Sequence, residues 1–172
     1  RNYGPVYSAN YVCCDYEEVF PYLTVARSTF HANRVGVSEG GNHAVIAALG
    51  ASHVTLSEST FTGNVAGSQD GVFYIVHKRY FSVNSSDLSI SEIDVQETNI
   101  LDCDISRNEA EYNNAVGAVY NGIVNIVRTR INGNIQHDQD AGEGTVLRFY
   151  GVDPLRIMDS DMRYNSLGRD GG

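Results

Sequence analysis

Tryptophan is absent from this chain of 172 residues, and proline and cysteine each occur only three times. Three cysteines are too few for a small domain built on disulfides, and their irregular spacing fits no zinc site. Charged residues make up only 19% of the chain, which argues against a disordered segment. No run approaches the roughly 20 apolar residues that a membrane helix needs, so we expect no insertion into a membrane.

Basic residues are also scarce, with 12 Lys and Arg against 21 Asp and Glu and a net charge of −9. An acidic surface disfavours nucleic acid and anionic membranes as partners. Glycine, by contrast, occurs 17 times and punctuates short runs rich in Val, Ile and Thr. This composition is typical of a globular, all-β domain long enough to bury a sizeable core.

A short pattern returns five times along the chain and is clearest in residues 56–64. It consists of an aliphatic residue, a small residue three places later, a large apolar residue two places further on, and an asparagine three places after that. Taking the large apolar residue as position zero, its occupants are Phe30, Phe61, Ile105, Ile131 and Met162. The asparagines at position +3 are Asn33, Asn64, Asn108, Asn134 and Asn165. The small residues at position −2 are Ser28, Ser59, Cys103, Thr129 and Ser160.

The spacing of this pattern predicts two short strands joined by a corner. Residues two apart in a strand point to the same side, so positions −7 and −5 share one side and positions −2 and zero share another. Asparagine suits a tight turn, and stacked asparagines can bond along a ladder of parallel strands. Repeats of about 30 residues indicate a solenoid. We therefore predict one parallel β-helix domain over residues 1–172, with about five to seven coils and an internal asparagine ladder.

Two segments depart from the pattern. Residues 1–20 are rich in tyrosine, and we interpret them as an irregular or incomplete coil. Residues 65–97 fall in the longest step between asparagines and are either an extra, degenerate coil or a loop excursion. Asn84 in this segment begins the sequon Asn-Ser-Ser and is the candidate glycosylation site. Because neither end of the chain looks like an amphipathic cap, we expect the chain to be part of a longer solenoid.

The repeat resembles that of right-handed parallel β-helix proteins of the pectin-lyase-like class. More narrowly, it is similar to the repeats of polymorphic outer-membrane proteins and related surface adhesins, which carry Gly-Gly-Ala-Ile and Phe-x-x-Asn motifs. The windows 30–33 and 61–64 match the second motif, and 117–120 is the nearest counterpart of the first. The resemblance covers residues 21–167. This stretch differs from those proteins in that it contains neither an autotransporter barrel nor a targeting segment. It implies a secreted or cell-surface solenoid used for structure or adhesion.

The best catalytic candidates form one column at position −3: Asp102, Arg128 and Asp159. Polysaccharide lyases and hydrolases need paired or calcium-bound carboxylates near a basic residue, held in a groove. A surface ladder of salt bridges is the competing interpretation. The signatures of paired Asp with Gly-His-Gly are absent, so no catalytic residue is assigned.

Asp138, Asp140 and Glu143 are candidate metal ligands that could gather around calcium, which prefers several oxygen ligands. Their spacing matches no complete calcium loop, so we interpret them as a solvated acidic loop and predict no cofactor. Cys103 is expected to be a buried free thiol, and the pairing of Cys13 and Cys14 stays open. The five histidines show no ligand spacing and are interpreted as surface or turn residues: His31, His43, His53, His77 and His137.

From these observations we expect an extracellular structural or adhesive module that forms part of a surface appendage or filament. Its partners would be neighbouring protein domains or subunits, or a carbohydrate. A polysaccharide lyase or glycoside hydrolase of the β-helix class is the alternative function.

Overall fold

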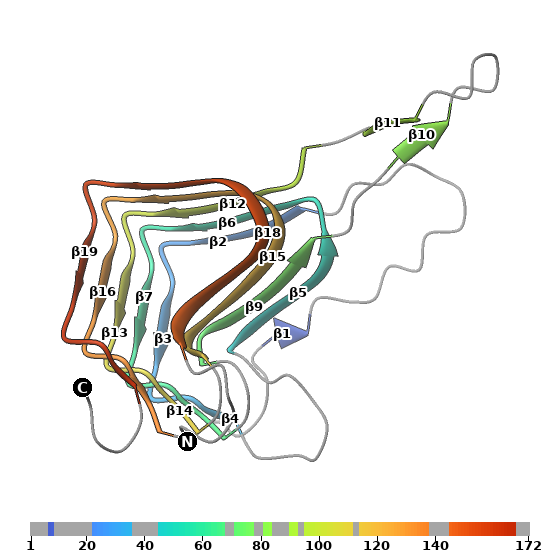
Figure 1. Ribbon diagram of the computed structural model, residues 1–172. Coiled ribbons are helices and arrows are strands. Elements are labelled where there is room, and N and C mark those ends of the chain that lie inside the picture. The colour runs from blue at the N-terminus through green and yellow to red at the C-terminus, as the bar shows by residue number, and fades with distance from the viewer. Residues whose placement is uncertain are drawn as a thin grey trace.

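The computed structural model describes residues 7–8, 22–35, 45–67, 71–77, 81–83, 90–92, 95–111, 114–137 and 145–167. In these ranges the chain is all-β, with twenty strands and no helix. Nearly all strands pair in parallel, as Figure 1 shows from one end of the stack. The described part of the chain therefore contains no helix long and apolar enough to span a membrane.

Five successive groups of strands follow the repeat in the sequence. Each group runs from position −8 or earlier, through position zero, to the residues just after the asparagine. The first two groups are β2 (Tyr22–Ala26), β3 (Thr29–His31) and β4 (Arg34–Val35), then β6 (His53–Ser57), β7 (Thr60–Thr62) and β8 (Val65–Ala66). The third is β12 (Glu97–Leu101), β13 (Asp104–Ser106) and β14 (Glu109–Ala110). The last two are β15 (Asn114–Val127), β16 (Arg130–Asn132) and β17 (Ile135–Gln136), then β18 (Thr145–Met158), β19 (Asp161–Arg163) and β20 (Ser166–Leu167).

Equivalent strands of neighbouring groups pair in parallel and in the register that the repeat predicts. β3, β7, β13, β16 and β19 form one five-stranded sheet, and β4, β8, β14, β17 and β20 form another. In the first of these sheets the successive Cα partners are Phe30 and Phe61, Phe61 and Ile105, Ile105 and Ile131, and Ile131 and Met162. The five position-zero residues therefore lie in one row.

A larger sheet of eight strands bends around a corner, because its long strands continue from one face of the stack onto the next. β15 pairs with β9 (Phe73–His77) through residues 117–120, and with β12 through residues 123–127. β18 pairs with β15 along nearly all of its length. β5 (Ile46–Ala51) pairs with β9 and with β1 (Tyr7–Ser8). Figure 1 shows β5, β9, β15 and β18 side by side on one side of the stack.

The segment between β9 and β12 is an insertion, because the strands on either side of it pair with consecutive parts of the preceding group. His77 is level with Ala51, and Glu97 is level with His53. In the group before, only Ser52 separates Ala51 from His53, so Gln96 occupies the level of Ser52. Residues 78–95 are therefore inserted between two consecutive levels. The described part of this insertion is an antiparallel pair, β10 (Phe81–Val83) and β11 (Ile90–Glu92), which lies away from the stack in Figure 1.

Two corners of each group are made by residues with left-handed backbone. The first is position −3, where Arg27, Glu58, Asp102, Arg128 and Asp159 have φ between 47° and 53°. The second is position +2, occupied by Ala32, Gly63, Arg107, Gly133 and Tyr164 with φ between 52° and 64°. This conformation costs roughly 1–2 kcal/mol for residues other than glycine. It persists because the strands on both sides of each corner are fixed by pairing.

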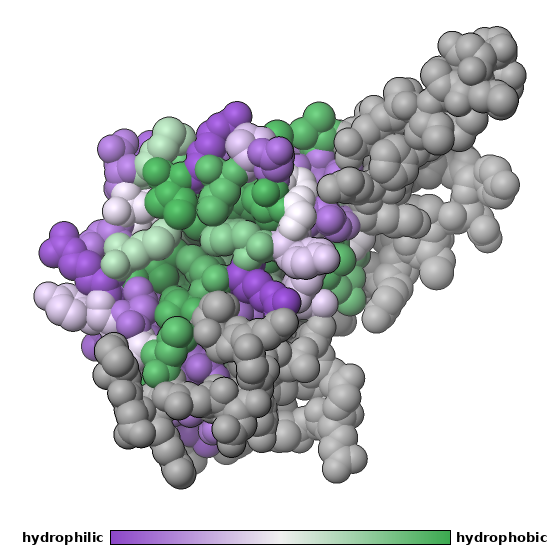
Figure 2. Space-filling view, viewed as in Figure 1, coloured by the Kyte–Doolittle hydropathy of each residue, from purple (hydrophilic) through white to green (hydrophobic). Residues whose placement is uncertain are grey.

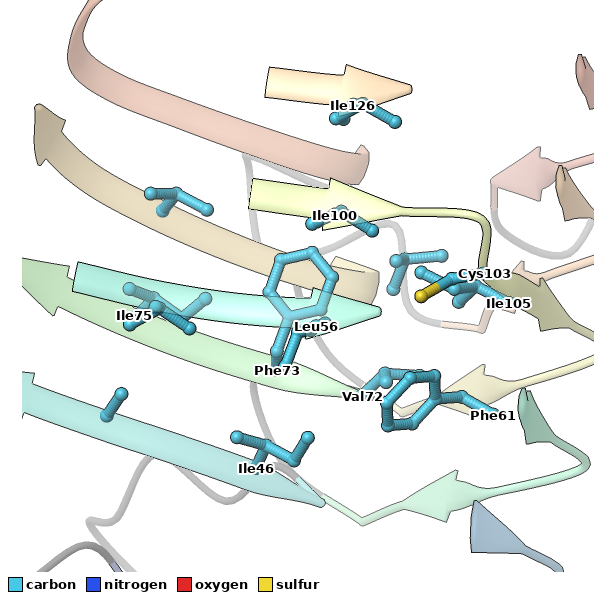
Figure 3. Packing of buried hydrophobic residues seen from close by; sticks show 14 of the residues in the cluster. Ile46, Leu56, Phe61, Val72, Phe73, Ile75, Ile100, Cys103, Ile105 and Ile126 are labelled. Atoms are coloured by element: carbon cyan, nitrogen blue, oxygen red, sulfur yellow. The ribbon is translucent and has the colours of Figure 1, made fainter. Parts of the chain in front are cut away.

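The interior is apolar, and it follows the period of two that strands impose. Leu56 and Ile100 at position −5, and Phe61 and Ile105 at position zero, are fully buried. Phe61 stacks on Phe30 with ring centroids 4.9 Å apart. Figure 3 shows these side chains converging with Val72, Phe73 and Ile75 from the opposite side of the stack.

The asparagines at position +3 hydrogen-bond to one another along the stack. The Asn33 backbone N–H and Nδ2 both donate to Asn64 Oδ1, at 3.1 and 2.9 Å. Asn64 donates in the same way to Asn108, at 3.0 and 2.8 Å. The two further steps repeat this arrangement, from Asn108 to Asn134 and from Asn134 to Asn165. Each buried amide is thereby fully engaged, which offsets the cost of removing it from water.

Candidate functional site

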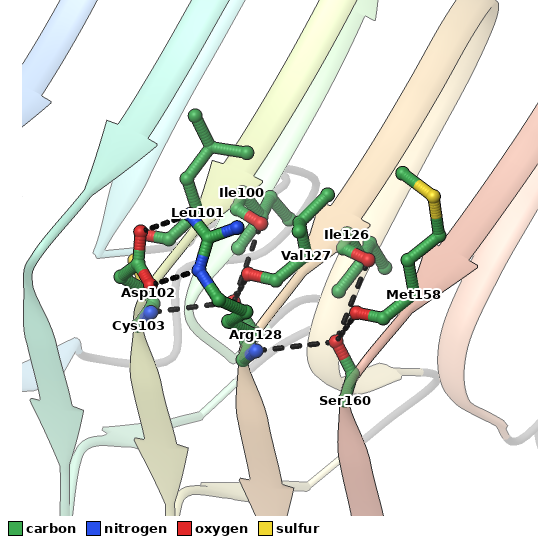
Figure 4. Close-up of polar contacts among 10 residues, drawn as sticks. Ile100, Leu101, Asp102, Cys103, Ile126, Val127, Arg128, Met158 and Ser160 are labelled. Atoms are coloured by element: carbon green, nitrogen blue, oxygen red, sulfur yellow. Dashed lines mark hydrogen bonds and ion pairs between the residues drawn. The ribbon is translucent and has the colours of Figure 1, made fainter.

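The column at position −3 brings Asp102 and Arg128 together on the outer surface. Both residues sit at left-handed corners, after β12 and β15 respectively. Arg128 Nε and Nη2 donate to the two oxygens of Asp102, each at 2.7 Å (Figure 4). This is the bidentate geometry in which arginine binds a carboxylate most strongly.

A second ion pair lies beside the first, at position −1. Arg130 hydrogen-bonds Asp104 with both its Nε and Nη2 groups, and Nε is 3.1 Å from Asp104 Oδ1. The Ser106 hydroxyl also donates to Asp104. At the next level the pattern changes, because Asp161 pairs with Arg163 of its own strand. Asp159 makes no hydrogen bond to another described residue, but its charge contributes to raising the pKa of Arg128.

These contacts hold both carboxylates in their ionised form. The hydrogen bonds from Arg128 lower the pKa of Asp102, and they outweigh the opposing effect of desolvation. Partial burial alone would raise the pKa of Asp104, but hydrogen bonds from Arg130 and Ser106 outweigh it and lower this pKa also. A general acid for glycoside cleavage needs a raised pKa. Neither Asp102 nor Asp104 meets this requirement.

Around these pairs the surface is hollowed into an open depression of about 470 Å³. It is lined by the two ion pairs and by residues 58–60 of the preceding group. The side chains of Arg128 and Arg130 are more than half exposed, so they can still contact an anionic ligand from solvent. The arrangement suits weak, salt-dependent binding of charged groups better than acid–base chemistry, because exposed ion pairs are solvated and screened.

Beneath the charged corner runs a row of small hydroxyl and thiol residues at position −2. The Cys103 backbone N–H donates to Thr129 Oγ1, and the Thr129 N–H donates to Ser160 Oγ (Figure 4). Cys103 is a free, buried thiol, as predicted. Burial raises the pKa of its thiol, so Cys103 stays protonated and is unsuited to act as a nucleophile.

No group of three or more His, Cys, Asp or Glu side chains that could hold a metal occurs in the described ranges. The sequence-predicted calcium candidates Asp138, Asp140 and Glu143 lie outside these ranges. So do the sequon residue Asn84 and the adjacent pair Cys13 and Cys14.

The interpretation of all histidines as surface or turn residues is wrong for His77. Its side chain is buried at the end of β9, because residues 73, 75 and 77 of this strand alternate inward. Nδ1 lies 2.7 Å from the Ala51 carbonyl and donates to it, and Nε2 lies 2.7 Å from Thr98 Oγ1 and accepts from its hydroxyl. Desolvation lowers the pKa of His77, so the ring is held neutral. Both nitrogens are engaged, which indicates a structural role.

Two outward-facing features were missed by the sequence reasoning. Tyr120 makes ring contacts with Tyr74 and Tyr150, with centroids 5.7 and 6.0 Å apart, on the face formed by β9, β15 and β18. On the next face, Asn125 Nδ2 donates to Glu97 and Asn99. The sequence does carry a signal for both features, because the tyrosines and the polar residues alternate with buried residues along their strands. Their juxtaposition depended on the stacking register.

Neither a family model, nor a curated protein, nor a solved structure matches this chain.

Proposed function

We propose that this chain is a right-handed parallel β-helix of the pectin-lyase-like kind that serves as a structural or adhesive module on a cell surface or outside the cell. The regular parallel pairing of five groups supports a coiled solenoid. The row of asparagine hydrogen bonds supports an internal ladder. Right-handedness is supported by the general preference of parallel crossover connections for that hand.

The observation that carries the functional part is the state of the carboxylates in the charged corner. Asp102 and Asp104 each have both oxygens engaged by an arginine, and the pKa of each is lowered. Such carboxylates are poor proton donors at neutral pH, and the arginines that hold them are poor bases. A surface built this way can bind and position a partner without transforming it.

The outer faces supply the means of adhesion. The tyrosines 74, 120 and 150 present aromatic rings at the surface, and Tyr150 is 63% exposed. Exposed tyrosine rings are amphipathic and rigid, which favours contact with sugars or proteins. The neighbouring domains or subunits expected as partners would contact these faces or the ends of the stack.

A polysaccharide assay tests this proposal against the enzymatic alternative. The chain is incubated with polygalacturonate, with and without calcium, and released oligosaccharides are quantified. We expect no product above that of Asp102→Asn or Asp159→Asn. Glu111→Gln, an exposed carboxylate on another part of the stack, is the matched control. Product formation by the unaltered chain and by Glu111→Gln, but not by the two corner variants, would replace the proposal by a polysaccharide-cleaving function.

A further inference from the structure

The C-terminal end of the stack exposes side chains that are buried one level deeper. Ile126 and Ile131 are fully buried, whereas the equivalent Ile157 and Met162 are 47% and 37% exposed. Leu155 is also 41% exposed. Figure 2 looks onto this end and shows a central hydrophobic area bordered by hydrophilic residues. The strands at this end, β18, β19 and β20, are edge strands in the described structure, and such edges favour pairing with further strands.

The opposite end of the stack is also apolar. Leu23, Val25 and Phe30 of β2 and β3 are only half-buried, and they line a depression of about 370 Å³ together with Ile46. Leu23, Val25 and Phe30 occupy positions −7, −5 and zero of the first group. Their counterparts at the C-terminal end are Leu155, Ile157 and Met162.

The hydrogen bonds within the stack have a direction, and this makes the two ends complementary. The asparagine backbone N–H and one Nδ2 hydrogen donate toward the C-terminal neighbour, whose Oδ1 accepts. The other Nδ2 hydrogen donates backward, to the position-zero carbonyl of the N-terminal neighbour. Backbone N–H groups at position −2 likewise donate to the hydroxyl of the next group. The C-terminal end therefore presents donors at Ser160 and Asn165. The N-terminal end presents acceptors, Ser28 Oγ and Asn33 Oδ1.

Charge follows the same complementarity at position −3. Within the stack Asp102 and Arg128 are successive members of this column and form a bidentate ion pair. The last member of the column is Asp159 and the first is Arg27, and both are exposed. Placing the first group of one copy on the last group of another would bring Arg27 next to Asp159 and repeat the pair.

We propose that the C-terminal end of the stack docks onto the N-terminal end of a second copy of this chain. The register continues that of the stack, with Phe30 of the second copy over Met162 and Asn33 over Asn165. The inference rests on the proposed role as a structural module and names its partner. A head-to-tail contact of this kind is heterologous and joins copies into rows unless the rotation between copies closes a ring.

Sedimentation velocity tests the contact, measured over about a hundredfold range of concentration because mass action governs association. We expect the unaltered chain to form species larger than a monomer as concentration rises. Ile157→Arg, which places a charge in the apolar contact, should weaken association at least tenfold. Met158→Arg is the matched control, because Met158 is adjacent and equally exposed but belongs to the outward line of β18. A monomer at every concentration, or equal loss with both variants, would overturn the proposal.

Charge reversal tests the head-to-tail direction. Arg27→Asp and Asp159→Arg each place like charges at the contact, so each variant alone should associate at least threefold more weakly. A mixture of the two variants offers Asp at position 27 against Arg at position 159, and it should recover association. Failure of the mixture to recover would overturn the register. The polysaccharide assay tests the proposed function independently of association. If the chain does not associate and also releases no oligosaccharide, only the docking contact is overturned.

Discussion

At the scale of single residues, one side chain type at a fixed place carries much of the specificity of this fold. Asparagine recurs at position +3 because its amide accepts from the N-terminal neighbour and also donates to both neighbours. Asn64 is completely buried, and its Nδ2 donates to both the Phe30 carbonyl and Asn108 Oδ1. The carboxamide carries two donor hydrogens and a separate acceptor oxygen, and it has no charge.

Asn64→Ala should destabilise the chain by about 3 kcal/mol, because it leaves several buried donors and acceptors without partners. Asn64→Asp keeps the acceptor but removes both donors, so it should also be strongly destabilising. Urea unfolding measures the free energy of unfolding of each variant. Asn99→Ala, at an outward and partly exposed asparagine of the same stack, is the control and should change this energy by less than about 0.5 kcal/mol. Equal effects at positions 64 and 99 would contradict the role of the buried row.

His77 should make stability depend on pH. Its pKa is lowered in the folded chain, so the unfolded chain binds the proton more readily. Stability is therefore fully present above the unfolded pKa of roughly 6.5 and is lost as pH falls through that value toward the folded pKa. The free energy of unfolding should fall by up to about 1.4 kcal/mol per pH unit in this window. His77→Gln should flatten this slope between pH 7 and 5 in urea unfolding, and an unchanged slope would exclude His77 as its source.

At the scale of elements, the corners and the long bent strands explain which features the sequence revealed. Inward positions recur as residue types, so the strands, their parallel stacking and their register could be predicted. The left-handed corners at positions −3 and +2 could not, because residues as different as Arg27, Asp102, Gly63 and Tyr164 occupy them. There the requirement falls on the backbone, while the side chains point outward and are free to vary. The candidate column of Asp102 and Arg128 was found from spacing, but its bidentate pairing required the structure.

The insertion between β9 and β12 gives the sharpest test at this scale. Deleting residues 78–95 would join His77 directly to Gln96. The equivalent residues of the neighbouring group, Ala51 and Ser52, are already consecutive in the chain. The 44-residue step between Asn64 and Asn108 would become 26 residues, the length of the next step. We expect the shortened chain to keep a β-type circular dichroism spectrum and a melting temperature within about 5 °C of the unaltered chain. Deletion of residues 97–101, which are β12, is the control and should abolish cooperative unfolding.

At the scale of the whole molecule, strand pairing in the described ranges joins each group to its immediate neighbours, so stability should vary along the stack. The position-zero row makes this measurable, because the same kind of side chain meets two neighbours in the middle and one at the end. Phe61 is fully buried between Phe30 and Ile105, whereas Met162 is 37% exposed and contacts only Ile131 in this row. The burial of each side chain, and not its position in the motif, should decide how much unfolding free energy is lost when it is truncated to alanine.

Phe61→Ala should therefore cost about 3–5 kcal/mol, the range for removing a buried aromatic side chain. Met162→Ala should cost about 1 kcal/mol or less, because part of its surface is already in water. Both values come from urea unfolding at a concentration low enough to keep the chain monomeric.

At high concentration, docking of a second copy would bury Met162, and the cost of Met162→Ala should then rise toward that of a buried methionine. A cost for Met162→Ala that equals that of Phe61→Ala at low concentration would contradict a stack whose end is open. A cost that stays the same across concentrations would contradict the docking of Phe30 over Met162.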